Sequence, residues 1–180
     1  LIVWSHSGFS SIKADVAVFK GKWMYEVMLG SKGVMQVGWA THKCRFSQEK
    51  GVGDTRDSYA YDGNRVRKWN LTTFKYGDTW HSGDVIGCAI DLDSGSVDFY
   101  RNGNHLGQAF NRIRVGPGFA YLPSVSLAYN ESLTANFGQT PLRYPVPGYQ
   151  PLEAIPFVDI KKANLMLDWI FKLIIVQAKQ

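Results

Sequence analysis

Between residues 14 and 138 the apolar side chains recur in short runs at every second position. Trp23, Tyr25 and Val27 fall on one face of such a run, whereas Met24 and Glu26 fall on the other. A period of two is that of an extended strand, and this stretch lacks the period of about 3.6 residues that marks an amphipathic helix. The alternation therefore restricts this region to a fold made of β-strands.

The strands are short and are separated by residues that favour tight turns. The stretch from Val85 to Leu92 is apolar on both faces, as expected of a strand enclosed in a core. Turn residues follow several runs, at Asp62-Gly63, Ser94-Gly95 and Asn102-Gly103. An Asn-Gly pair can adopt positive φ at both positions, as a two-residue type I′ hairpin requires. Many short strands with frequent glycine turns predict an all-β fold, an antiparallel β-sandwich.

Size and charge limit the kind of protein further. The chain has 180 residues, of which 45% are hydrophobic, enough for one large domain with a substantial core. Its net charge of +5 is modest, and lysines and arginines are scattered, at Lys43, Arg45, Arg56, Arg65, Arg67, Lys68, Arg112 and Arg114. A nucleic-acid module usually shows a denser basic stripe. We therefore expect no nucleic-acid partner.

The sequence changes character after residue 138. Five prolines, at positions 141, 145, 147, 151 and 156, predict an extended linker over 139–158. Apolar residues then recur at helical spacing and predict a helix over 159–178 that begins at Asp159 as N-cap. Charged residues interrupt its apolar face, so we expect no membrane span. Our preferred interpretation is the start of a following helical region; the alternative is a helix packed on this sandwich or on a second copy.

Several segments, taken in order, resemble the signature segments of SPRY domains. They are GKWMYEV at 21–27, QVGWA at 36–40, DSYAYDG at 57–63, GDVIGCAIDLDSGSVDFYRNG at 83–103, LPSVSL at 122–127 and SLTANFG at 132–138. The resemblance implies that residues 1–138 form a bent, concanavalin-like jelly roll. It also implies a domain without catalytic residues that binds protein or peptide partners through loops at one edge.

Within this family the chain is most similar to SPRY domains of large RING-type ubiquitin ligases. The run RVRKWNLTTFKYGDTWHSGDVIGCAIDLDSGSVDFYRNG and the helical tail carry this resemblance. It implies recruitment of a substrate, or of an accessory subunit, for ubiquitination and proteasomal turnover. The chain has only two cysteines and four histidines, too few for the two four-ligand zinc sites of a RING. The RING and its zinc are therefore expected elsewhere in the parent protein, and no metal or cofactor is expected here.

One loop segment stands out as a partner-binding candidate. Residues 58–69 combine tyrosine, tryptophan and arginine, the residue types that dominate binding energy at protein interfaces. The family resemblance adds the stretch before the first signature strand and the loop after LPSVSL. The predicted partner-binding residues are His6, Ser7, Tyr59, Arg65, Arg67, Trp69, Leu127, Ala128, Tyr129 and Asn130. For Tyr59, an alternative is that it simply belongs to a half-buried strand.

Other observations concern location and competing functions. The chain begins at Leu1 without a basic leader and apolar stretch, and its two cysteines provide no disulfide framework. We therefore expect a fragment of a longer, cytoplasmic protein. Gly51-Val52-Gly53 lacks the third glycine and the following helix of a dinucleotide site. Two other functions remain open: a structural scaffold within a large protein, and a lectin-like sandwich that binds glycans.

Overall fold

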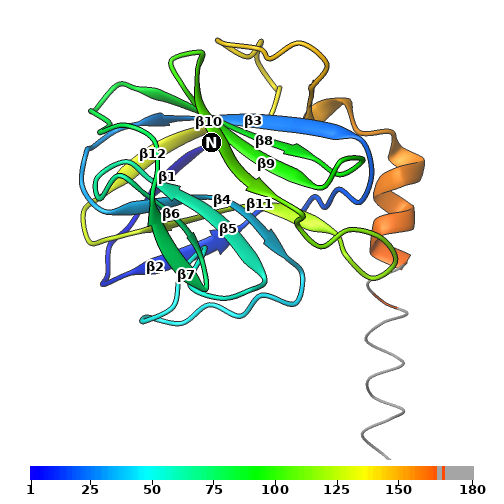
Figure 1. Cartoon of the computed structure of the whole chain (residues 1–180), viewed down its shortest axis with the longest axis horizontal. Coiled ribbons are helices and arrows are strands. Elements are labelled where there is room, and N and C mark those ends of the chain that lie inside the picture. The colour runs from blue at the N-terminus through cyan, green and yellow to red at the C-terminus, as the bar shows by residue number, and fades with distance from the viewer. Residues whose placement is uncertain (166–167, 169–180) are drawn as a thin grey trace, which may run out of the picture.

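The computed structural model describes residues 1–165 and residue 168, and it shows two β-sheets packed face to face (Figure 1). The first sheet has the order β1 (Ile2–Trp4), β12 (Ser132–Asn136), β3 (Lys22–Leu29), β8 (Val85–Asp91), β9 (Ser96–Arg101) and β10 (Asn104–Asn111). The second has the order β2 (Ser10–Lys13), β11 (Tyr121–Leu127), β4 (Met35–Thr41), β5 (Ser58–Asp62), β6 (Arg67–Asn70) and β7 (Thr72–Lys75). Neighbouring strands along both paths are antiparallel, which confirms the predicted sandwich.

Strands from the two ends of the domain pair with each other. In the first sheet Trp4 of β1 lies opposite Ser132 of β12. In the second sheet Ser10 of β2 lies opposite Leu127 of β11. The N-terminal strands therefore form one edge of each sheet, and the loops that join these four strands meet at one end of the sandwich.

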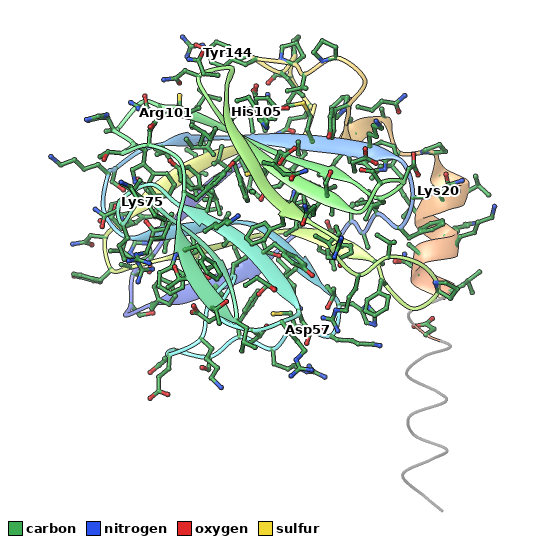
Figure 2. All side chains as sticks on the ribbon, viewed as in Figure 1. Lys20, Asp57, Lys75, Arg101, His105 and Tyr144 are labelled. Atoms are coloured by element: carbon green, nitrogen blue, oxygen red, sulfur yellow. The ribbon has the colours of Figure 1, made fainter. Side chains whose placement is uncertain are left out.

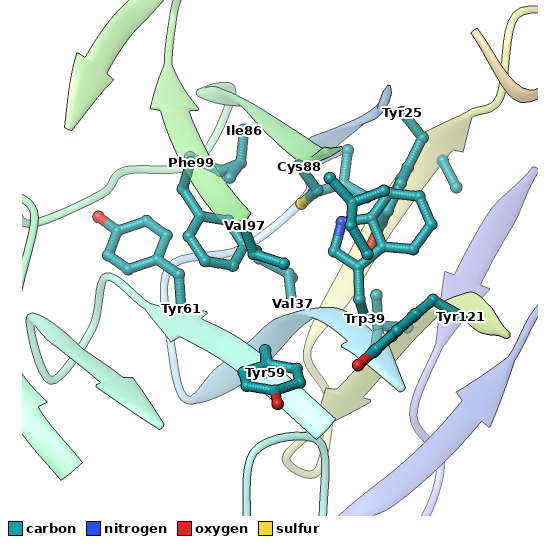
Figure 3. Close-up of a cluster of buried hydrophobic side chains, with 14 of the residues drawn as sticks. Tyr25, Val37, Trp39, Tyr59, Tyr61, Ile86, Cys88, Val97, Phe99 and Tyr121 are labelled. Atoms are coloured by element: carbon teal, nitrogen blue, oxygen red, sulfur yellow. The ribbon is translucent and has the colours of Figure 1, made fainter. Parts of the chain in front are cut away.

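The core between the sheets is rich in aromatic residues (Figure 3). The rings of Tyr25 and Trp39 meet edge to face, with centroids 5.2 Å apart. Those of Tyr61 and Trp80 do the same at 5.3 Å. Edge-to-face contacts place the positive edge of one ring on the negative face of another, which adds to the gain from burying the rings. The inward-facing residues of β3 join this core, as its alternation predicts.

The middle of the outer face of β3, at Met24 and Glu26, is also buried, although its alternation alone predicts a face turned to solvent. Residues 139–155 cross this face of the first sheet (Figure 1). The carboxylate of Glu26 accepts hydrogen bonds from the backbone N–H groups of Arg143, at 2.8 Å, and Tyr144, at 2.7 Å. Within this segment β13 (Gln150–Pro151) pairs in parallel with β3, and the 3-10 helix η1 (Leu152–Ala154) follows.

The helix begins at residue 157, two residues earlier than predicted. Asp159 is therefore not the N-cap; it lies in the first turn, where its carboxylate pairs with Lys20 at 3.3 Å. The backbone N–H groups of Asp159 and Ile160 donate hydrogen bonds to the carbonyl of Pro156. The predicted N-cap is wrong because the helix begins at residue 157, so Pro156, whose carbonyl accepts the first helical hydrogen bonds, takes the N-cap position.

Over 157–165 the helix packs on the sandwich, as in the alternative interpretation. Ala163 is 1% exposed and contacts a small cluster with Ala17, Ala120 and Leu122. The rest of the predicted helix, residues 166–167 and 169–178, lies outside the described residues. A following helical region therefore stays a prediction. In the described part of the chain no helix has the length and apolar character needed to cross a bilayer.

Candidate functional site

Two of the predicted partner-binding segments lie side by side. The N–H of Ser5 donates to the carbonyl of Glu131, and the N–H of Asn130 donates to the carbonyl of Ser5, both at 3.0 Å. These bonds continue the pairing of β1 with β12 into the loops. His6 and Ser7 are therefore held next to residues 128–130, although more than a hundred positions separate them in the sequence.

The exposed side chains of this pair of loops differ in character. Tyr129 is 62% exposed. The ring of His6 lies 4.9 Å from that of Trp4 in a tilted arrangement. Beside them a hollow of about 180 Å³ opens between β1, β2 and β11, lined by Trp4, Ser10 and Leu127 among others. Leu127 itself is 1% exposed, so it contributes the wall of this hollow and part of the core, not a free side chain.

A second group is formed by Arg65, Arg67 and Trp69 around the turn between β5 and β6. The guanidinium of Arg65 lies over the indole of Trp69, 4.4 Å from the ring centroid, and it also pairs with Asp62. Burial raises the pKa of the Asp62 carboxyl, while hydrogen bonds from Arg65 act in the opposite direction. Arg67 is exposed. The ring and the carboxylate hold the Arg65 guanidinium in place, which reduces the entropy that it loses when it binds a partner.

Two further loops connect these groups, and the predicted residues did not include them. The carboxylate of Glu131 accepts the N–H of Gly33 at 2.8 Å, and the side chain of Asn64 donates to the carbonyl of Lys32 at 3.1 Å. The loop around residues 31–34 thereby bridges the 128–131 loop and the β5–β6 turn.

The turn at 51–53 forms the second connection, between the β1–β2 loop, which contains Phe9, and β6, which contains Trp69. A Cβ on Gly53 would lie 2.5 Å from the Cβ of Trp69, and a Cβ on Gly51 would lie 2.4 Å from the ring of Phe9. The turn therefore fits between these two side chains only because both positions are glycine. The pair of glycines is the signal in the sequence that could have identified this turn.

Tyr59 does not belong to the exposed surface. It is 6% exposed, and its ring packs against that of Phe110, with centroids 5.1 Å apart. The centroid of the Tyr121 ring lies 6.1 Å from that of Tyr59 (Figure 3). Side chains along β5 point alternately to its two faces, and those of Tyr59 and Tyr61 point into the core between the sheets. The structure thus places Tyr59 as the alternative interpretation does, within a strand, and leaves a partner almost none of its surface.

The exposed residues of the two groups, together with the half-buried Trp69 and Ala128, define a surface at one end of the sandwich, which we call the loop surface. It consists of His6, Ser7, Arg65, Arg67, Trp69, Ala128, Tyr129 and Asn130. The surface combines rings, guanidinium groups and hydrogen-bonding groups, which suits recognition of a polypeptide.

The cysteines and histidines are not arranged for nucleophilic chemistry. Burial raises the pKa of the Cys88 thiol to about 12, so it is protonated at neutral pH. The sulfur of Cys44 lies 3.4 Å from the hydroxyl of Thr55, and the ring nitrogens of the nearby His42 have no hydrogen-bond partner among the described residues. Among residues 1–165 and 168, no three His, Cys, Asp or Glu side chains converge to hold a metal ion.

Comparison with known proteins agrees with this arrangement. Residues 22–140 match the family described as the SPRY domain. E3 ubiquitin-protein ligase RKP from Arabidopsis thaliana is 53% identical over 157 residues, which are 87% of this chain and 12% of that protein. ATP-dependent RNA helicase Ddx1 from Drosophila melanogaster is 32% identical over 129 residues, 72% of this chain and 17% of the helicase. The probable ATP-dependent RNA helicase ddx1 from Dictyostelium discoideum is 29% identical over 162 residues, 90% of this chain and 20% of that protein.

The chain thus spans a fifth or less of the length of these relatives, which differ in their whole-protein activities. The family match at residues 22–140 spans β3 to β12, and the segments that suggested this family lie at strands and hairpins of both sheets. The chain belongs to the SPRY domain family and is a non-catalytic protein-interaction domain.

Proposed function

We propose that this domain binds a protein substrate through the loop surface and holds it for ubiquitination by a RING-type ubiquitin ligase of which the domain is a part. The observation that carries the proposal is the gathering of the loop surface in a chain 53% identical to an E3 ubiquitin-protein ligase. A ligase of this kind acts by bringing a charged carrier close to its substrate, so a binding domain contributes proximity and orientation. The expected location is the cytoplasm.

The chemistry of the loop surface indicates the type of partner segment. Arg65 and Arg67 provide planar donors for carboxylates or backbone carbonyls, and Tyr129 and Trp69 provide apolar contact area. The hollow beside Trp4 can take one apolar side chain. A short extended peptide, or a loop that carries an acidic residue and an apolar residue, fits this combination.

A structural scaffold is the second candidate, and one observation favours it. Phe157, Val158 and Leu165 are 70%, 55% and 61% exposed on the described part of the helix. Apolar side chains exposed together often mark a contact with another part of a protein. This function is compatible with the first, because the helix and the loop surface are different parts of the molecule.

A matched pair of variants tests the proposal. Arg67→Glu with Tyr129→Ala removes one cation and one exposed ring from the loop surface, and Lys161→Glu with Phe157→Ala makes the same change on the helix. Affinity capture from cytosol, with quantitative mass spectrometry, compares both with the wild type after circular dichroism confirms folding. We expect a set of proteins that only the loop-surface variant fails to capture.

The same substitutions are then placed in the full-length ligase. Proteins lost from the loop-surface variant should no longer be ubiquitinated by it, and the helix variant should retain this activity. Unchanged capture and ubiquitination with the loop-surface variant would contradict the proposal. If only the helix variant loses captured proteins, the result would support the second candidate, a structural scaffold.

A further inference from the structure

Cationic side chains that are scattered in the sequence gather at the end of the second sheet opposite the loop surface. We call this group the basic patch, and it consists of Lys13, Lys43, Arg45, Arg56 and Arg114. Figure 2 labels Asp57, the carboxylate at this end. Contacts of these residues with one another and with neighbouring groups define the patch, and several of them join residues that are far apart along the chain.

The aromatic ring of Phe119 holds two of the cations. The Lys43 ammonium lies 5.4 Å from the centroid of this ring, and the Arg114 guanidinium lies 5.0 Å from it. Arg114 also pairs with Asp57 and donates to the carbonyl of Arg56 at 2.8 Å. The 112–119 loop is thereby attached to the segment that follows β4.

Lys13 lies on the other side of the patch. Its ammonium donates to the carbonyl of Cys44 at 2.8 Å. Burial lowers the pKa of Lys13, and the positive charge of Arg45 lowers it further, although Cys44 acts against both. Burial also lowers the pKa of His42, and the charges of Lys43 and Lys13 add to this effect. For both groups burial is the largest cause, and the neighbouring positive charges act in the same direction.

The charges of the patch are not balanced. Of the five cations, only Arg114 pairs with a carboxylate, that of Asp57, among the residues that the structure describes. Lys43, Arg45 and Arg56 are exposed, and none of them forms a salt bridge within the part of the chain that the structure describes. The carboxylate of Asp54, in the same loop, accepts a hydrogen bond from the N–H of Gly51 at 2.7 Å. Counted together with Asp57, the five cations carry a formal charge of +4.

The basic patch is separate from the loop surface. At the start of β4, the carbonyl of Val34 accepts the N–H of Ala128, which belongs to the loop surface. At the end of β4, the N–H of Thr41 donates to the carbonyl of Asp57. The seven residues of β4, at about 3.3 Å per residue, place the two surfaces about 20 Å apart.

The geometry favours a protein over a nucleic acid. Single-stranded nucleic acids bind with their bases stacked on exposed rings, but Lys43 and Arg114 cover the ring of Phe119. The cations come from the end of β2 and from the loops that follow β4 and β10, so they do not form a continuous stripe along one element. Flexible lysine and arginine side chains around a small area suit several carboxylates on a short segment.

We propose that the basic patch is a second protein-binding surface, which takes an acidic segment of a partner, rich in aspartate and glutamate. It acts independently of the loop surface, and its test does not depend on the proposed function. Such a surface increases the association rate by electrostatic attraction and fixes the orientation of a partner that is bound elsewhere.

The test measures binding of short probes to the whole chain by fluorescence anisotropy at low salt. The probes are a labelled peptide of eight alternating Asp and Glu residues, the same peptide with Asn and Gln, and an eight-nucleotide oligo-thymidine. The patch variant is Lys43→Glu, Arg45→Glu and Arg56→Glu. The control variant is Lys75→Glu, Lys161→Glu and Lys162→Glu, which changes the net charge equally at exposed positions elsewhere.

We expect the acidic peptide to bind, the neutral peptide not to bind, and the affinity to fall as salt rises. The patch variant should lose about tenfold or more in affinity, and the control variant about twofold or less. Equal losses in both variants, or none in the patch variant, would overturn the proposal because binding would then reflect net charge or another surface. Tighter binding of the oligonucleotide than of the acidic peptide would also overturn it, in favour of a nucleic-acid ligand.

Discussion

At the scale of single residues, Asp84 shows how one half-buried carboxylate stabilises a turn. Its oxygens accept the N–H of His81 and the guanidinium of Arg101, both at 2.7 Å, and the side-chain amide of Asn102 at 2.8 Å. Partial burial acts to raise the pKa of Asp84, but the hydrogen bonds from Arg101 and Asn102 outweigh it and lower the pKa. The entry to β8 is thereby attached to the end of β9.

We predict that Asp84→Asn lowers the free energy of unfolding at pH 7 by about 1–3 kcal/mol, because hydrogen bonds to a charged group are lost. A carboxylate whose pKa is lower in the folded state stabilises at pH values above its unfolded pKa. This contribution disappears as the pH falls through the folded pKa. The difference between variant and wild type should therefore shrink on acidification.

Urea unfolding at pH 7 and at about pH 3 measures this difference. Asp93→Asn is the control, because Asp93 is exposed and accepts a single bond, from the N–H of Gly21. A difference for Asp84→Asn that is the same at both pH values would show that its charge has no part in stability.

At the scale of elements, the helix over 157–165 is attached by a small contact. Ala163 packs among Ala17, Ala120 and Leu122, and the pair of Lys20 with Asp159 lies on the surface. Small side chains let the helix approach the sandwich closely, so a larger or charged group at position 163 has no room. The salt bridge contributes little, because the Lys20 side chain is 59% exposed and ordering it costs entropy.

We predict that Ala163→Glu releases the helix from the sandwich without unfolding the sheets, because it places a charge in an apolar contact. Asn164→Glu is the matched control, since residue 164 is exposed. Hydrogen exchange measured by mass spectrometry should become faster over 157–165 in the first variant and stay unchanged in β3 and β8. Unchanged protection over 157–165 would contradict the docking seen in the structure.

At the scale of the whole molecule, one aromatic core joins the two sheets. The core cluster includes residues from β3, β8 and β9 of the first sheet and from β4, β5 and β11 of the second (Figure 3). The pairing of β1 with β12 also connects the two ends of the domain. The sheets should therefore unfold together, as small single domains do.

We predict that Ile86→Ala, at a fully buried position of β8, lowers the free energy of unfolding by about 2–5 kcal/mol. Hydrogen exchange should accelerate equally in the core strands of both sheets, because global unfolding exposes both. Ile2→Ala is the control, since Ile2 is 76% exposed. Acceleration confined to the first sheet would show that the sheets unfold separately.

The sequence by itself determined the strands, the turns and the family. Alternation places Trp23, Tyr25 and Val27 in the core, because side chains along a strand point to opposite faces. Asn102 and Gly103 have positive φ, at 50° and 81°, as their hairpin requires. These features depend on neighbours in the chain, so they can be predicted without knowledge of the fold.

Tertiary structure alone decided which surfaces are covered and which residues meet. Glu26 is buried because residues 143 and 144 cross the sheet, and Tyr59 is buried because β5 faces the core. The loop surface and the basic patch each combine side chains that are up to about a hundred or more positions apart. Their proximity follows from strand pairing over long sequence distances, and a pattern of local periods contains no information about it.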